Sequence, residues 1–150
     1  MNVIEQLIRF RRDTLALETD INRLEAMTER AAAAKTSYRE YETHGVGAPS
    51  DPTGIAAARI ADFDRELRQR IETQSEKRRI LERIITTTLP PVLAAVIKIY
   101  YIDARSMADA TTIIFGAEPN FAAEIDNFTR RTYRRRRAAL DILREQGDEK

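Results

Sequence analysis

The sequence predicts an all-α protein in which two long helices precede a C-terminal helix-turn-helix domain. Two observations carry this prediction. The five glycines and five prolines of the 150-residue chain are clustered, so that long stretches contain neither residue type. Within those stretches, apolar residues recur at the spacing of one helix face. We expect residues 1–88 to form a helical hairpin and residues 89–150 to form the helix-turn-helix domain.

The first helix is expected from Asn2 to about Glu42, because this stretch holds no glycine or proline. Its apolar residues follow heptad spacing, which is typical of a coiled-coil stripe. Thr14, Thr28 and Lys35 are weak positions in that stripe, which is most secure up to Leu24. The apolar members are Val3, Leu7, Phe10, Leu17, Ile21, Leu24, Ala31 and Tyr38.

The segment "THGVGAPSDPTG" interrupts the helical pattern with three glycines and two prolines. We place a linker at residues 43–52. Ser50 or Asp51 is expected to cap the helix that follows, with Pro52 in its first turn. His44, the single histidine of the chain, lies in this linker without another candidate ligand nearby. Neither a metal site nor a histidine-based catalytic site is therefore expected.

The second helix is expected to run from Pro52 to about Thr87. A short linker between helices of similar length favours an antiparallel hairpin. The same stripes can also pair with a second copy of the chain, which predicts a homo-oligomer. Gln74 and Arg78 interrupt the stripe of this helix. Its apolar members are Ile60, Phe63, Leu67, Ile71, Leu81, Ile84 and Ile85.

Three shorter helices are expected after Pro90 and Pro91. The first, from Val92 to Ile102, carries Lys98 as its single charge and should be buried on most sides. The second is expected at residues 107–115. Ser106 is its expected N-cap and Gly116 its expected end.

The last helix is expected to begin after Asn120, as its cap, and to reach about Glu145. A short helix joined by a turn to a long basic helix is the outline of a helix-turn-helix domain. On a helical wheel, one side of this helix is apolar. That side comprises Phe121, Ile125, Phe128, Thr132, Ala139 and Leu143.

The same helix carries "RRTYRRRR", residues 130–137, in a chain with a formal net charge of only +1. Arg130, Arg134 and Arg137 lie opposite the apolar side. Arg131 and Arg135 flank them, and Arg136 alone falls near the apolar side. Between Asn120 and Leu140 the only acidic residues are Glu124 and Asp126, and both precede the run.

The arginine run favours a nucleic-acid contact over a solvated helix face. Guanidinium groups bind phosphate bidentately and stay charged. Like charges one helical turn apart destabilise a helix, so the run needs a compensating role. Arg130, Arg134 and Arg137 are the expected phosphate contacts, and Asn127 is expected to reach a base edge.

The stretch "LERII", followed by "IYYIDARSMADA" and an arginine-rich helix, resembles small phage-encoded transcriptional regulators of the RinA/ArpU type. The resemblance covers about residues 52–145, and the pair Tyr100–Tyr101 is its most specific part. It implies a C-terminal domain like sigma-factor region 4, which binds double-stranded DNA and activates phage or prophage late genes, packaging or lysis genes among them. The DNA contacts that it implies are Asn127, Arg130, Arg131, Arg134 and Arg135, with Arg137 added from the helical wheel.

Two features of the sequence depart from these regulators. The turn "FGAEPNFAAEID" is longer, and the last helix begins with acidic and apolar residues. These departures argue against base reading by this helix more than they argue against phosphate binding. Two alternatives therefore stay open: a coiled-coil protein that docks on RNA polymerase or another protein, and a phage packaging component such as a small terminase subunit.

Composition bounds the remaining possibilities. The chain has no cysteine, which excludes disulfides and suits the reducing cytoplasm of a bacterial host. No apolar stretch approaches the ~18–20 residues of a membrane span. The sequence holds no glycine-rich phosphate loop and no nucleophile elbow. We therefore expect no enzymatic activity, no cofactor and no metal.

Overall fold

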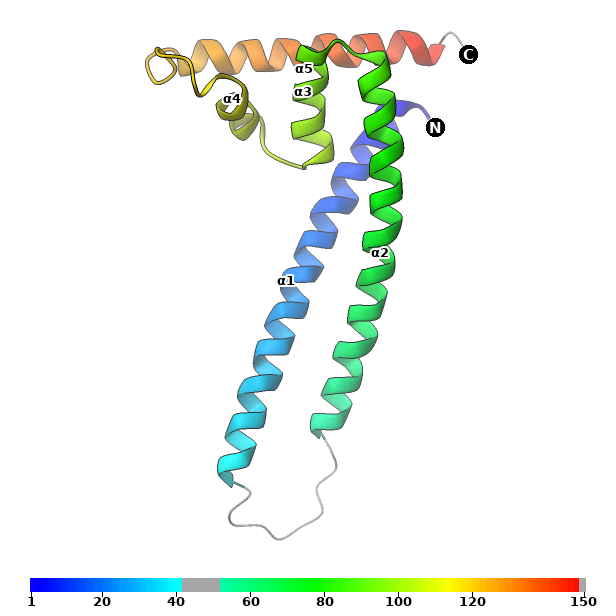
Figure 1. Ribbon diagram of the computed structural model, residues 1–150, viewed down its shortest axis with the longest axis vertical. Helices are drawn as coiled ribbons and strands as arrows, with labels where there is room; N and C mark the ends of the chain where they lie inside the picture. The colour runs from blue at the N-terminus through cyan, green and yellow to red at the C-terminus, as the bar shows by residue number, and fades with distance from the viewer. Residues whose placement is uncertain (42–51, 149–150) are drawn as a thin grey trace. The chain divides into compact units, whose positions relative to one another are not determined.

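The computed structural model describes residues 1–41 and 52–148, and every regular element in these two ranges is a helix. The all-α prediction is confirmed. Figure 1 shows two long helices followed by shorter ones. The elements are α1 (Val3–Tyr41), α2 (Pro52–Thr88), α3 (Pro91–Ile97), the π-helical segment η2 (Lys98–Ile102), α4 (Met107–Phe115) and α5 (Ile125–Asp148). The expected caps Ser50 and Asp51, His44 and nearly all of the expected linker lie outside the described residues.

The helices form two compact units. One unit, here called the hairpin unit, comprises Ala16–Thr73. The other, here called the terminal unit, comprises Met1–Leu15 and Gln74–Lys150. The terminal unit therefore takes in the start of α1 and the end of α2, and it reaches further into the long helices than the expected division at residue 88.

Within the hairpin unit, α1 and α2 pair in an antiparallel manner. Asp20 accepts a hydrogen bond from Arg70, with 2.6 Å between Oδ2 and Nη1. The guanidinium of Arg23 lies 5.9 Å from the ring centroid of Phe63. The later residue of α1, Arg23, contacts the earlier residue of α2, Phe63. The two helices therefore run in opposite directions.

The apolar stripe of the hairpin unit is narrow. Leu17 and Leu67 are buried, whereas the other stripe residues of this unit that the structure describes are half-buried or exposed. Ile71, expected in the stripe, is 42% exposed. The seam of α2 passes through Arg70 instead, one turn after Leu67, and this arginine pairs with Asp20. Arg70 follows Leu67 at heptad spacing, so Ile71 lies one position outside the seam.

The terminal unit has a dense apolar core, to which α1, α2, α3, η2 and α5 all contribute. Its buried residues include most of the expected stripe residues from both long helices in this unit. Because α5 packs against both α3 and α4, the core is covered from several directions. Its members are Leu7, Phe10, Leu81, Ile85, Leu89, Ala94, Ile97, Tyr101, Ile102, Ala139 and Leu143.

The two polar interruptions of the α2 stripe make specific contacts in the terminal unit. Gln74 donates through Nε2 to the Phe10 carbonyl oxygen at 3.0 Å and to Thr14 Oγ1 at 2.8 Å. The polar residue in the stripe of α2 thus hydrogen-bonds the polar residue Thr14 in the stripe of α1. Such pairing compensates for the cost of placing polar groups in an apolar seam.

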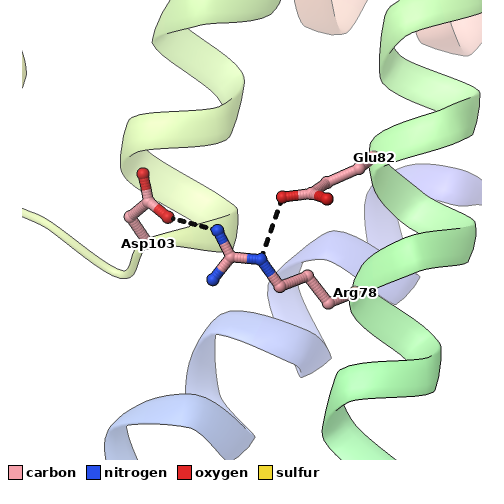
Figure 2. Close-up of polar contacts among 3 residues, drawn as sticks. All are labelled: Arg78, Glu82 and Asp103. Carbon is pink, nitrogen blue, oxygen red and sulfur yellow. Dashed lines mark hydrogen bonds and ion pairs between the residues drawn. The ribbon is translucent and has the colours of Figure 1, made fainter.

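Arg78, the second interruption, links α2 to the end of η2. Its Nε lies 2.9 Å from Glu82 Oε1, and its Nη2 lies 2.9 Å from Asp103 Oδ1, as Figure 2 shows. Burial works against the charge on Arg78, but the hydrogen bonds and charges of Glu82 and Asp103 outweigh it and raise the pKa of the guanidinium. Arg78 thereby joins the start of the loop before α4 to the long helix.

The α3 segment and η2 together cover the expected helix at residues 92–102. The backbone amide of Asp103 donates to the carbonyl of Lys98, which widens the last turn. Ala104 follows with φ of 55°, a left-handed conformation that is costly for a residue with a side chain. The chain turns sharply there and enters α4.

The expected boundaries of α4 are confirmed. Ser106 caps it, because its Oγ accepts from the backbone amide of Asp109 at 3.0 Å. Gly116 ends it and donates its backbone amide to the Thr112 carbonyl. A Cβ at Gly116 would overlap the Thr112 carbonyl oxygen, so glycine is required at this close approach.

The expected start of the last helix is wrong. The helix α5 begins at Ile125, and Asn120 does not cap it: its side chain donates to Glu124 Oε2 at 2.7 Å within the turn. Phe121 accordingly lies in the turn, where its backbone amide donates to the Glu118 carbonyl. Ile125, expected on the apolar side, is 48% exposed, whereas Phe121 packs from the turn onto Phe128.

Candidate nucleic-acid interface

The inner side of α5 is fixed against α4 by a polar contact as well as by apolar packing. Thr111 of α4 donates to Thr132 of α5, with 3.0 Å between the two Oγ1 atoms. The Thr132 hydroxyl donates to the Phe128 carbonyl oxygen one turn earlier in α5, and Thr111 Oγ1 lies 2.9 Å from the Met107 carbonyl oxygen. Both threonines are buried. This bridge and the buried Phe128, Ala139 and Leu143 set which side of α5 faces outward.

The outer side of α5 presents three arginines in a row. Arg130, Arg134 and Arg137 are exposed, as the helical wheel predicts. Within the described part of the chain, none of the three forms an ion pair with a carboxylate. Arginine residues without a counter-ion on one helix face form a surface that attracts phosphate.

Arg131 and Arg135 flank this row on the side of α4, and an aromatic cluster positions them. Their guanidinium carbons lie 4.9 Å and 4.7 Å from the ring centroid of Phe115. Phe128 stacks between Phe115 and Phe121, with centroid distances of 5.0 Å and 5.8 Å. Stacking occupies the faces of a guanidinium and leaves its N–H donors, which lie in the plane, available to an anion.

Arg136 has a structural role that the sequence does not reveal. Its Nη2 donates to the hydroxyl of Tyr101 at 3.1 Å, and its guanidinium carbon lies 4.5 Å from the ring centroid of Tyr100. Arg11 of α1 stacks on the same Tyr100 ring at 4.1 Å. The position of Arg136 near the apolar side, together with two tyrosines in a preceding helix, is the only signal for this contact in the sequence.

Asn127 lies in the first turn of α5, three residues before Arg130. It is exposed, as are its neighbours Ile125 and Asp126 and the preceding Glu124. The structure thus places all six expected DNA-contacting residues on α5, five of them exposed and Arg135 half-buried. Asn127 precedes Arg130 and Arg131 by one helical turn and follows the acidic residues Glu124 and Asp126.

Comparisons with known proteins do not identify the chain. No protein-family model matches it, and neither curated proteins nor solved structures match it. The resemblance to regulators of the RinA/ArpU type therefore stays a prediction.

Across residues 1–41 and 52–148, no helix combines the length and the apolar character that a membrane crossing requires. Over the same residues, no three histidine or acidic side chains come together as potential metal ligands.

Proposed function

We propose that this protein binds double-stranded DNA through the outer face of α5. The observation that carries the proposal is the row of Arg130, Arg134 and Arg137, exposed and without carboxylate partners among the described residues. The aromatic cluster adds Arg131 and Arg135 as preoriented neighbours. In the regulators that the sequence resembles, this helix serves transcription of phage or prophage genes, and we propose the same role here.

A salt-dependent binding experiment tests this proposal. Fluorescence-anisotropy titrations of labelled duplex DNA, at several salt concentrations, compare the natural protein with an Arg130→Ala, Arg134→Ala, Arg137→Ala variant. Each lost phosphate contact lowers the slope of log K against log salt by about 0.9. We therefore expect weaker binding and a slope that is smaller by about 2 to 3.

A matched control separates local contacts from net charge. Arg30, Arg59 and Arg79 are exposed and have no ion pair among the described residues, so their replacement by alanine changes the net charge equally. This control should keep nearly the full salt slope. Equal losses in both variants, or no binding at low salt, would contradict a DNA surface on α5.

A second candidate function is docking on another protein, such as RNA polymerase. It is favoured by large apolar side chains that remain exposed on α4 and α5. Ile113 is 58% exposed, Ile125 is 48% exposed and Tyr133 is 50% exposed. An Ile113→Ser, Ile125→Ser variant should keep full DNA affinity if the two surfaces are separate, and should lose polymerase binding if this candidate is correct.

The oligomeric state tests the remaining alternative, a phage packaging component. We propose that the long helices also mediate self-association, because Ile8, Leu15 and Ile80 are large apolar residues exposed on the start of α1 and the end of α2. Light scattering coupled to size-exclusion chromatography measures the mass. A dimer would suit a regulator, whereas a ring of many copies would favour a packaging component.

A further inference from the structure

The charge of α4, the following turn and α5 is divided sharply along the chain. From residue 106 to residue 129, which covers α4, the turn and the start of α5, the sequence contains no lysine or arginine. The same stretch contains four acidic residues, so its formal charge is −4. All four are exposed: Asp109, Glu118, Glu124 and Asp126. The six arginines of the run follow immediately at residues 130–137.

This division matters because of how a helix-turn-helix reads bases. The N-terminal residues of its second helix enter the major groove and contact base edges. In this protein those residues are Ile125, Asp126 and Asn127, preceded by Glu124. Inserting them would bring uncompensated carboxylates close to phosphates on both sides of the groove, where like charges repel.

The connection between the two helices is also unlike that of a base-reading domain. A tight turn of about 3–4 residues sets the approach of the second helix in such domains. Here the turn occupies residues 116–124, between the end of α4 and the start of α5. Phe121 of this turn packs on Phe128. This contact anchors the acidic segment, residues 118–126, beside the N-terminal end of α5.

We infer that the arginine face binds duplex DNA through the phosphate backbone without reading its sequence. This inference rests on the proposed DNA binding through α5 and does not depend on the proposed role in transcription. The middle of α5, from Arg130 to Arg137, meets the duplex, and the acidic segment at residues 118–126 keeps the N-terminal end of the helix out of the groove. Contacts to phosphate and sugar carry no sequence information by themselves. The ligand is therefore double-stranded DNA of any sequence.

Selection from a random duplex library tests the inference directly. The full-length protein is incubated with the library at moderate salt, and bound duplexes are amplified and sequenced over several rounds. We expect no enriched motif, and affinities of individual duplexes within about threefold of one another. Specific sites typically bind about 10³-fold or more tightly than other sequences, so an enriched motif with such a preference would overturn the inference and leave the proposed function intact.

Charge-removing variants give a second readout with opposite expectations. If the acidic segment is only repelled by DNA, Glu124→Gln with Asp126→Asn should strengthen binding severalfold on every duplex, most strongly at low salt. If those carboxylates accept hydrogen bonds from cytosine, the same change would weaken binding to some sequences, which would overturn the inference.

Asn127→Ala is the matched test for base contact at the same end of α5. We expect its affinity for any duplex to stay within about twofold of the natural protein. Failure of the proposed function looks different from failure of the inference: the natural protein would then bind no duplex, or would bind with the same salt slope after loss of Arg130, Arg134 and Arg137.

Discussion

The hairpin unit and the terminal unit are built from the same two long helices, yet they bury apolar surface very differently. In the terminal unit, Leu7, Ile85 and Ile97 are all 0% exposed. In the hairpin unit, among the described residues, only Leu17 and Leu67 count as buried. Two helices alone leave the flanks of their shared seam open, whereas α3, η2 and α5 cover the seam in the terminal unit. Regular spacing therefore predicts a face but not the depth of its burial.

The largest expected effect comes from a cavity in the terminal unit. Ile97→Ala removes a side chain that is 0% exposed, and buried Ile→Ala changes cost about 2–5 kcal/mol of unfolding free energy. Leu67→Ala in the hairpin unit should cost less, about 1–2 kcal/mol, because its half-exposed surroundings can collapse onto the gap. Urea unfolding followed by circular dichroism measures both. Equal losses would break the comparison between the units.

A pair of glycines gives the next largest effect. Gly116→Ala should destabilise the protein by about 1–3 kcal/mol, since the new Cβ overlaps the Thr112 carbonyl oxygen and the backbone must shift. At Gly147, nothing lies within 4 Å of an added Cβ. Gly147→Ala should therefore be neutral or stabilising by up to about 1 kcal/mol, because alanine favours the helix. Melting temperatures that move in the same direction would contradict this account.

Two adjacent arginines separate structural from surface roles within α5. Arg136→Ala should cost about 1–3 kcal/mol, because it leaves the buried Tyr101 hydroxyl without its donor. Arg137→Ala should change stability by less than about 0.5 kcal/mol, as is usual for an exposed side chain, while weakening DNA binding. Thermal unfolding and anisotropy on both variants check the two roles. A stability loss at Arg137 as large as at Arg136 would show that the outer face is packed.

The fold was largely predictable from the sequence because it depends on local signals. Glycine and proline mark the ends of the helices, and the spacing of Leu7, Leu17 and Leu67 marks their inner faces. The outward row on α5 was predictable for the same reason. It needs only the helical repeat and the position of the buried side.

The sequence failed where contacts distant along the chain decide the outcome. Arg136 depends on Tyr100 and Tyr101, which precede it by more than thirty residues. The start of α5 at Ile125 follows a turn in which Phe121 packs onto Phe128. No cap residue in the sequence indicates this start. Ile71 is 42% exposed because the seam passes through its neighbour Arg70. Each failure is a tertiary override of a local preference.

The smallest expected effect concerns that ion pair, Asp20 with Arg70 in the hairpin unit. Its atoms are 2.6 Å apart, but the two side chains are 28% and 37% exposed, so solvent screens their attraction. A double-mutant cycle with Asp20→Ala and Arg70→Ala should give a coupling free energy below about 1 kcal/mol that falls further as salt rises. A coupling well above that value and insensitive to salt would mean that the pair is shielded from water. The hairpin seam would then be closed by a covering surface, such as a second copy of the chain, and the contrast with the terminal unit would disappear in the assembled protein.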